Sequence, residues 1–439
     1  MAAPLTIKGQ KTITTPWQER ILKRDFDIVL GKMLKTEQGN EIETEEPYLR
    51  SANVQWDGVD LSDIKTMWFS SREKKELLLR VGDLLVNEGG DVGRCSTWVG
   101  GLDACYFQNS VNRVRPIQKA STRFLYYWLY NMKHAGFIDA IVGRTTIAHL
   151  TAEKLETIPW PDAPPLEQQR IAAYLDASCA AIDAAVAAKR RQLETLDVLR
   201  TSIISRAVTQ GLNRRAALKP SGLDWVPEVP DHWQIRQIKR LCSLVRGQFT
   251  HRPRNDPALY DGPYPFIQTG DITAAGKYIR THSQTLNELG LSASKQFPRG
   301  TLVMSIAANI GDVAILDFEA CFPDSMIGMI PGHKTNLDFL YYLMRSMRSI
   351  MLRSAVQSTQ LNLNYVRIGT NFAPVPPLIE QAAIAEYLDA KEHESHLISS
   401  TIQAQIVSLT AYRKSLIHEC VTGQRRVTEA DINRVRANG

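Results

Sequence analysis

The sequence lacks paired cysteines, a long apolar run and a dominant charge. Its six cysteines show no Cys-x-x-Cys spacing, which argues against a disulfide framework or a zinc finger and indicates reduced thiols in a cytoplasm. The mean hydropathy is −0.22, and the longest aromatic-rich run, 124–130, is far too short to cross a bilayer. Residues 1–15 contain no apolar segment of the kind found in secretory signals. We therefore expect a cytoplasmic protein that has no membrane partner.

Composition also excludes a disordered or fibrous chain. Hydrophobic residues make up 44% of the 439 residues and charged residues 22%, which is enough apolar material for two or three packed domains. Lys and Arg together number 52 against 46 Asp and Glu, so the net charge is +6. This mildly basic balance is compatible with nucleic-acid binding but does not demonstrate it.

Motifs of the common catalytic and metal sites are missing as well. The glycine-rich segment 89–93 lacks the Gly-Lys-Ser/Thr ending of a P-loop and predicts a turn after a strand. The sequence has no Asp/Asn-Pro-Pro-Tyr/Phe segment and no Pro-Cys dipeptide, so a methyltransferase site is not expected. His393 and His396 lie closer together than the two histidines of a His-Glu-x-x-His zinc motif. We expect no catalytic residue, no metal site and no bound cofactor in this chain.

What the sequence does contain is an internal repeat. The segment 167–177 returns as 380–390, and the similarity continues without a gap to Val208-Thr209 in the first copy and Val421-Thr422 in the second. A Pro-Pro-Leu sequence precedes each copy, and weaker similarities upstream appear in the same order in both halves. The chain is therefore a duplicated unit, in which a variable globular part is followed by a similar C-terminal segment.

The repeated segment is predicted to be a long helix. Its apolar residues recur at a spacing close to 3.6, no Gly or Pro interrupts 167–210, and Gly211 is placed to end the helix. The second copy has the same pattern and is expected to end near Gly423. Long helices with one apolar stripe are seldom stable alone, so we expect the two copies to pack together as a coiled coil. The alternative is that each helix caps its own domain independently.

The globular halves are predicted to be mixed α/β. β-rich runs at 82–86 and 300–306 are flanked by glycine and asparagine turns, and tyrosine-rich runs around Phe124 and Phe339 indicate buried helices. A proline-spaced connector, 219–233, separates the first long helix from the second globular part.

Basic residues supply the candidates for binding nucleic acid. Arginine suits both phosphates and guanine edges, although most such contacts only position the backbone. The arginines in or near predicted loops are Arg94, Arg113, Arg115, Arg144, Arg246, Arg252, Arg254, Arg280 and Arg353. The run Lys189-Arg190-Arg191 on the first helix is either a set of phosphate contacts or a solvated helix face.

Together these features carry a resemblance that covers nearly the whole chain. Each half contains a variable domain, a Pro-Pro-Leu sequence, the motif Glu-Gln-x-x-Ile-Ala-x-Tyr-Leu-Asp and a long helix. The connector adds Ser-Gly-Leu-Asp-Trp-Val-Pro-Glu-Val-Pro-Asp-His-Trp at 221–233. In this combination the chain resembles the specificity subunit of type I restriction–modification enzymes.

The resemblance implies two target recognition domains in tandem repeat, separated by two long antiparallel helices that form a coiled coil. Each domain is expected to bind one half of a bipartite, asymmetric DNA target, and the helices are expected to set the spacing between the halves. The implied divisions are the first recognition domain, the central repeat helix, the connector with the second recognition domain, and the C-terminal repeat helix, at 1–158, 159–212, 213–371 and 372–439. The chain itself is expected to be non-catalytic, as part of a restriction system that defends a cell against phage.

Partners follow from the same resemblance. It implies two modification subunits that bring S-adenosylmethionine, and restriction subunits that bring ATP and Mg²⁺. The helix starts are alike in both halves while their surroundings vary, so we expect a partner common to both halves to dock there. The residues are Pro165, Leu166, Glu167, Gln168, Pro377, Leu378, Glu380 and Gln381. The alternative is that the prolines only end the globular domain.

One turn differs in sequence between the two halves. The second half has Ser-Thr-Gln-Leu-Asn-Leu at 358–363, close to a turn of the family, so Gln360 and Asn362 join the DNA-binding candidates. Segment 145–150 has neither Gln nor Asn, and a structural role is expected there.

Two alternative functions stay open. The first is a fragment of a fused restriction–methylation enzyme, against which the missing motifs count, and the second is a coiled-coil adaptor without a DNA role.

Overall fold

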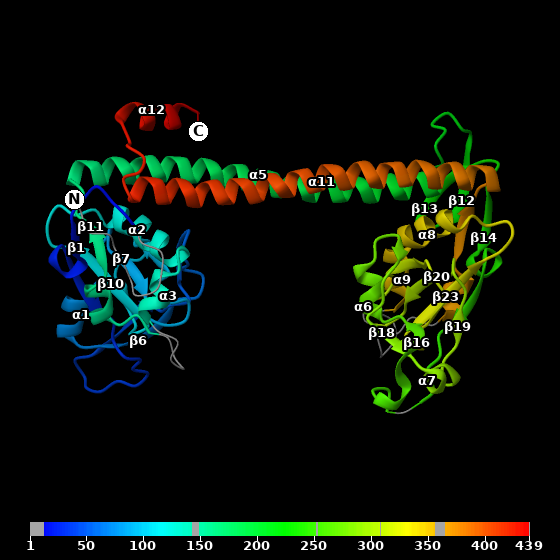
Figure 1. Ribbon diagram of the computed structural model, residues 1–439, viewed down its shortest axis with the longest axis horizontal. Coiled ribbons are helices and arrows are strands. Elements are labelled where there is room, and N and C mark those ends of the chain that lie inside the picture. The colour runs from blue at the N-terminus through cyan, green and yellow to red at the C-terminus, as the bar shows by residue number, and fades with distance from the viewer. Residues whose placement is uncertain (1–12, 143–148, 252, 308, 356–364, 439) are drawn as a thin grey trace. The chain divides into compact units, whose positions relative to one another are not determined.

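The computed structural model describes residues 13–142, 149–251, 253–307, 309–355 and 365–438, which form two compact units. Unit 1 comprises Met1–Arg190 and Gln403–Gly439, and unit 2 comprises Arg191–Ile402. Each unit contains one globular domain and parts of both long helices, α5 (Pro165–Gln210) and α11 (Leu378–Val421). The domain and its helix segments can be followed in Figure 1.

Unit 1 is built around two β-sheets that share one domain. The first sheet is antiparallel, and its strands in spatial order are β2 (Phe26–Leu30), β10 (Val111–Pro116), β7 (Leu84–Asn87) and β8 (Cys95–Thr97). The second sheet has the order β6 (Lys65–Phe69), β3 (Thr44–Leu49) and β9 (Tyr106–Phe107), with β3 and β9 parallel. Strands β1 (Glu19–Ile21) and β11 (Pro159–Pro161) pair with each other and bring the two ends of the domain together.

A buried helix covers the first sheet of unit 1. Helix α2 (Thr122–His134) begins at Ser121, whose hydroxyl accepts a hydrogen bond from the Phe124 N–H, and its residues 124–132 are buried. The same apolar core includes Ile182 from α5 and Leu416 from α11. The long helices are therefore part of the core of the domain, and burial of their apolar stripe stabilises both.

Unit 2 repeats this plan with different residues. The strands of its first sheet, in spatial order, are β15 (Cys242–Arg246), β23 (Met326–Pro331), β20 (Leu302–Ser305), β21 (Val313–Leu316) and β17 (Tyr278–Ile279). The second sheet has the order β18 (Gln284–Leu286), β16 (Tyr260–Phe266), β22 (Ala320–Cys321) and β19 (Gln296–Phe297), and its β16–β22 pairing is parallel, like β3–β9. Strands β14 (Gln234–Gln237) and β24 (Phe372–Val375) pair as β1 and β11 do, and helix α8 (Leu337–Ser346) takes the place of α2.

The remaining elements are short and decorate the two domains. In unit 1 they are η1 (Leu22–Arg24), β4 (Val54–Gln55), β5 (Gly58–Val59), α1 (Ser71–Leu77), α3 (Phe137–Val142), α4 (Ala152–Glu156) and α12 (Glu429–Asn438). In unit 2 they are β12 (Leu218–Leu223), β13 (Val226–Pro230), η2 (Ile238–Arg240), η3 (Pro257–Leu259), α6 (Thr269–Ala274), α7 (Glu288–Ser292), α9 (Arg348–Ala355) and α10 (Tyr365–Thr370).

The two long helices run antiparallel in each unit, as the repeat predicts. In unit 1 the start of α5 shares a core with the end of α11, and in unit 2 the end of α5 shares a core with the start of α11. Ion pairs join the helices directly, Asp183 to Arg413 at 3.2 Å in unit 1 and Arg200 to Glu392 at 2.6 Å in unit 2. The predicted helix pairing is confirmed, and the alternative of independent capping helices is wrong. The helices end at Gln210 and Val421, close to the predicted glycines.

Helix α5 also contains an apolar stretch that the hydropathy of the whole chain does not reveal. Among the described residues it is the one helix long and apolar enough, by length and composition, to cross a bilayer, with a mean hydropathy of 1.5 in that stretch. Because α5 packs on α11 and on both domain cores, this property fits a helix that buries an apolar stripe in a protein core.

Candidate functional site

A tryptophan joins the start of each long helix to its domain. The Trp17 Nε1–H donates a hydrogen bond to Glu167 Oε2 over 3.3 Å, and the Trp233 Nε1–H donates one to Glu380 Oε2 over 3.0 Å. In addition, His232 Nε2 lies 2.6 Å from Oε1, the other carboxylate oxygen of Glu380. Both glutamates of the predicted docking set therefore hold the helix start against its own domain, which the repeat alone does not indicate.

The two glutamines of that set are buried, and each accepts a hydrogen bond from the N-cap residue of a helix in the globular domain. The Ser121 N–H donates to Gln168 Oε1 over 2.9 Å, and the Asn336 N–H donates to Gln381 Oε1 over 2.8 Å. Ser121 and Asn336 are the N-caps of α2 and α8. Gln168 and Gln381 are only 2% and 1% exposed, so almost none of their surface is left for a partner. The same interaction between a long helix and the start of a domain helix is thus present in both units.

The most exposed of the docking residues are apolar. Pro165 and Pro377 are exposed, Leu166 is 67% exposed and Leu378 is 48% exposed. Ile379, which stands at the repeat position of Leu166, is 86% exposed and was not among the predicted docking residues. Pro165 stands at the repeat position of Leu378. An alignment that matches the two Pro-Pro-Leu sequences is therefore shifted by one position and places Leu166 opposite Leu378 instead of Ile379.

Exposed residues continue from Ile379 along one face of α11. Ala383 and Tyr387 follow at intervals of one helical turn, and both are exposed. We call Ile379, Ala383 and Tyr387 the α11 strip. Its repeat counterpart on α5 is formed by Leu166, Arg170 and Tyr174.

Two of the candidate arginines serve the interior of unit 1. Arg113 and Arg115 lie on strand β10 rather than in a loop, so that part of the sequence interpretation is wrong. Arg113 pairs with Asp27 at 2.6 Å, has a side chain that is 4% exposed, and has its pKa lowered mainly by burial. Arg115 donates two hydrogen bonds of 2.7 Å to the buried carboxylate of Asp83. Their partners are distant in sequence, which is why no local pattern reveals the pairs.

Arg246 and Arg254 lie at the surface, whereas the Arg94 side chain is 20% exposed and pairs with Asp91 at 3.6 Å. Arg246 and Arg254 meet at one residue, since Arg246 donates to the Asp324 carbonyl oxygen over 2.8 Å and Arg254 pairs with the Asp324 carboxylate at 2.5 Å. Arg94 follows the turn after β7 and donates to the Ser51 carbonyl oxygen over 3.5 Å. An Arg246–Arg254 pair on an exposed surface supplies two cations that a phosphate backbone could engage.

Arg353 lines a surface cavity of about 530 Å³ in unit 2, beside Trp225 and Phe372. Arg280 is exposed and pairs with Asp317 at 3.5 Å. The remaining predicted DNA-binding residues, Arg144, Arg252, Gln360 and Asn362, lie outside the described residues.

A larger cleft of about 810 Å³, lined by charged residues of both signs, lies in unit 2, and no sequence pattern indicated it. Its basic residues are Arg200 of α5, Lys277 just before β17, Arg345 of α8 and Arg348 of α9. Each is paired within the unit: Lys277 lies 2.6 Å from Asp389 and 2.7 Å from Asp338, and Arg348 lies 2.9 Å from Asp312. The Lys277–Asp389 pair ties the globular domain of unit 2 to α11, whereas the Lys277–Asp338 and Arg348–Asp312 pairs lie within that domain.

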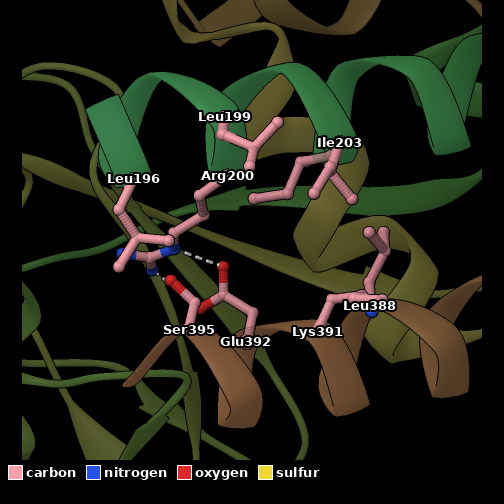
Figure 2. A pocket seen from close by; sticks show the side chains of 9 residues that line it. Leu196, Leu199, Arg200, Ile203, Leu388, Lys391, Glu392 and Ser395 are labelled. Carbon is pink, nitrogen blue, oxygen red and sulfur yellow. Dashed lines mark hydrogen bonds and ion pairs between the residues drawn. The ribbon is translucent and has the colours of Figure 1, made fainter. Parts of the chain in front are cut away.

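The helix pair of unit 2 is held by one carboxylate. Figure 2 shows Arg200 of α5 reaching Glu392 of α11, with hydrogen bonds of 2.6 and 2.7 Å, and Arg345 adds a third at 3.2 Å. Burial alone raises the pKa of Glu392, but the hydrogen bonds and charges of the two arginines outweigh it, so its pKa lies below the usual range. An apolar groove of about 30 Å³ runs beside this pair, lined by residues that include Leu199, Ile203 and Lys391.

Metal ligands and cysteine thiols can be assessed among the described residues. Among them, no three His, Cys, Asp or Glu side chains lie close enough to hold a metal ion. All six cysteines are buried, and burial raises the pKa of Cys179 to about 11 and that of Cys420 to about 12, which leaves them poor nucleophiles.

Comparison with known proteins gives a consistent result. A family model for the type I restriction modification DNA specificity domain matches residues 15–195 and again 230–407. The chain is 22% identical to the type I restriction enzyme MjaX specificity subunit of Methanocaldococcus jannaschii, over 86% of this chain and 87% of that one. It is 20% identical to the type I restriction enzyme EcoBI specificity subunit of Escherichia coli, over 95% of this chain and 88% of that one.

Solved structures share the fold at low sequence identity. The HsdS subunit of Thermoanaerobacter tengcongensis matches with a TM-score of 0.57 at 15% identity, covering 96% of this chain and 100% of that one. A chain from a study of complex assembly and conformational transition in a type I R-M system matches with a TM-score of 0.71, also at 15% identity, covering 93% and 98%.

Proposed function

The chain belongs to the type I restriction modification DNA specificity family, and from this premise we propose that it is the non-catalytic DNA-recognition subunit of a cytoplasmic restriction–modification complex. Each globular domain binds one half of a bipartite, asymmetric target. The observation that carries the proposal is the duplicated unit, in which two domains of the same strand plan are each tied to a long helix by a Trp–Glu hydrogen bond. Such a chain has two separate surfaces for reading DNA.

Arginines at the surface of the domains are the proposed DNA contacts. Arg246, Arg254, Arg94 and Arg353 keep this role, as do Arg144, Arg252, Gln360 and Asn362. Arg113 and Arg115 instead support the strand on which they lie. Most of these contacts are expected to neutralise phosphates, with sequence read by a minority of side chains.

Exposed apolar residues at the helix starts are the proposed docking sites for two modification subunits. Pro165 and Leu166 in unit 1, and Pro377, Leu378 and Ile379 in unit 2, present contiguous apolar surface that a monomer in water does not need. The modification subunits bring S-adenosylmethionine, and restriction subunits bring ATP and Mg²⁺, so this chain holds none of these groups. The helix pair is proposed to set the spacing between the two half-sites.

Domain exchange tests whether each domain reads one half-site. The junction should follow β11, because β11 pairs with β1 and an exchange that ends before it mixes strands from two proteins. Replacing residues 1–163 by the matching part of a relative should change one half of the methylated motif and preserve the other. Sequencing of methylated bases in cells reads the result directly, and a folded exchange protein that changes both halves contradicts the proposal.

Two simpler assays separate the other functional classes. Methyl transfer by the purified chain with S-adenosylmethionine and duplex DNA, in the absence of partners, would show that the chain is an enzyme. Duplex binding that weakens steeply as salt rises, and strengthens when modification subunits are added, supports the recognition role. The absence of salt-sensitive binding under both conditions favours a coiled-coil adaptor.

A further inference from the structure

The repeat places equivalent residues on the helix pair of unit 1 and on that of unit 2. In unit 1 a later segment of the chain covers these residues, whereas in unit 2 they are exposed. In unit 1 the chain continues beyond α11 into α12, which lies beside the helix pair (Figure 1). Val427 and Ile432 of this C-terminal segment are 6% and 4% exposed and belong to the same apolar core as Leu175 and Cys420. Arg170 of α5 pairs with Glu429 of α12 at 2.9 Å. We call residues 424–438 the C-terminal cover.

A pair of equivalent tyrosines shows the difference between the two faces. Tyr174 is 4% exposed, and the Arg425 guanidinium of the C-terminal cover lies 5.2 Å from its ring centroid. Tyr387 stands at the repeat position of Tyr174 and is 38% exposed. The contact with Arg425 of the cover is one that Tyr387 does not have among the described residues, and it contributes to the contrast in exposure.

Unit 2 leaves the corresponding apolar surface open. The α11 strip is exposed along its length, and Leu199 of α5 is 53% exposed beside the groove that Ile203 and Lys391 line. The β12–β13 hairpin occupies a different side of α5, where Val198, Thr201 and Ser205 face it. The open surface therefore has no counterpart of the cover among the described residues of unit 2.

The chemistry of the cover indicates what binds the open surface. The cover presents aliphatic side chains, Val427 and Ile432, together with an acidic residue, Glu429, that pairs with a basic residue of the long helix. The open surface offers apolar Ile379, Tyr387 and Leu199, and at its edge basic Lys391, which pairs with Glu394 at 2.6 Å on the same helix. A partner helix with aliphatic residues on one side and a carboxylate near its start fits this surface.

We propose that the C-terminal cover makes the two docking sites for the modification subunit unequal. The first modification subunit binds the open α11 strip in unit 2, and the second binds unit 1 only after the cover moves away from Arg170 and Tyr174. This inference rests on the proposed function. The cover is held by buried Val427 and Ile432, by partly buried Val435, by the Arg425 contact with Tyr174 and by the exposed Arg170–Glu429 ion pair. All of these contacts must be released before a partner can occupy the same surface. If the cover were open in about one molecule in ten, the apparent affinity of unit 1 for the modification subunit would fall about tenfold.

The experiment titrates the full chain with purified modification subunit and counts bound copies by native mass spectrometry. The full chain should load one copy at a concentration about tenfold lower than the second. A chain that stops after Gly423 should load both copies at similar concentrations. Glu429→Arg, which places like charges together, should narrow the difference, and the double variant Arg170→Glu, Glu429→Arg should restore it because the pair is re-formed with its charges exchanged.

A second pair of variants identifies the stronger site. Leu199→Asp should weaken loading of the first copy, whereas Val198→Asp, at an even more exposed neighbouring position on the hairpin side, should leave it unchanged. Equal loading of two copies by the full chain, or an unchanged difference after removal of the cover, overturns the inference. Failure of the unaltered chain to bind any modification subunit overturns the proposed function instead.

Discussion

Gly423 lies against Trp17, so close that a Cβ at this glycine would stand 2.9 Å from Trp17 Cη2 and 2.6 Å from Pro16 Cγ. The same tryptophan donates a hydrogen bond to Glu167, and so one side chain holds the end of α11 and the start of α5 in unit 1. Trp233 makes the matching contacts in unit 2 with Gly211 and Glu380. In each domain, a single tryptophan side chain thus contacts the end of one long helix and the start of the other.

Gly423→Ala should lower the stability of unit 1 more than an ordinary glycine substitution. Gly423 has a φ of +72°, which costs an alanine about 1 kcal/mol, and the new methyl group must also displace Pro16 or Trp17. Gly136→Ala is the matched control, since its φ is +82° and nothing lies within 4 Å of its Cβ position. Denaturant unfolding should show a larger loss for Gly423→Ala, and equal losses would mean that the Trp17 contact does not hold the helix end.

Arg200→Met should destabilise the helix pair of unit 2. The substitution leaves Glu392 half-buried with Arg345 as its remaining cationic partner among the described residues, and losing hydrogen bonds between charged groups costs about 1–3 kcal/mol. Arg191→Met is the control, because Arg191 is exposed on the same helix. Thermal unfolding by calorimetry measures both, and a loss no greater than that of the control contradicts a stabilising role for the pair.

Periodicity in the sequence predicts the long helices because their burial pattern is local. An apolar residue every three to four positions marks the buried stripe of α5, and glycines mark both helix ends, without knowledge of the partner. The repeat then identifies the partner. The pairing of Asp183 with Arg413 and Arg200 with Glu392 does not follow from the pattern, since it depends on the register between segments far apart in the chain.

Similarity between the two halves is a less direct guide to the site. Gln168 and Gln381 are repeated and buried, and each binds the N-cap residue of a domain helix, whereas Leu166 and Ile379 are repeated at the surface. The sequence shows both pairs as repeated and cannot separate internal joints from docking surface. In the same way, Arg113 looks like Arg246 in sequence, and only the three-dimensional position of Asp27 shows that Arg113 is buried in an ion pair.

Acidification should destabilise unit 1 through two histidines. Burial lowers the pKa of His134, which stacks on Tyr130 at 3.9 Å, and the nearby charges of Lys414, Arg413 and Lys133 act in the same direction. Burial also lowers the pKa of His418. The unfolded chain therefore binds more protons than the folded one just below the ordinary histidine pKa of about 6.5, so this stability is complete above that pH and falls as the pH drops below it.

The measurement is the melting temperature of unit 1 at pH 7.5 and at pH 5.5, followed by calorimetry. The double variant His134→Phe, His418→Gln keeps an aromatic ring on Tyr130 and removes both titrating groups. Its absolute stability should be lower, but the difference between the two pH values should shrink. An unchanged difference would assign the acid sensitivity to other groups.

Surface arginines and internal arginines should affect DNA binding in different ways. Arg246→Ala combined with Arg254→Ala should weaken duplex binding and reduce the slope of log affinity against log salt by about 0.9 for each phosphate that is no longer neutralised. Arg113→Met should lower the stability of unit 1, because it strips Asp27 of its partner, and leave that slope unchanged in the folded protein. A slope that falls with Arg113→Met but not with the double variant would reverse the assignment of these residues.

Insertion into both long helices tests whether they set the DNA spacing. Duplicating Ala184-Ala185-Val186-Ala187 in α5 adds about one turn and about 6 Å, and duplicating residues 399–402 in α11 keeps the Asp183–Arg413 and Arg200–Glu392 pairs in register on either side. B-DNA rises about 3.4 Å per base pair, so the unread spacer in the methylated motif should grow by roughly one or two base pairs while both half-sites stay the same. Inserting into α5 alone should cost stability, because one of the two ion pairs must then break. Sequencing methylated DNA from cells that carry the double insertion measures the spacer directly. Methylation that persists with an unaltered spacer would mean that the helices do not position the two domains on DNA.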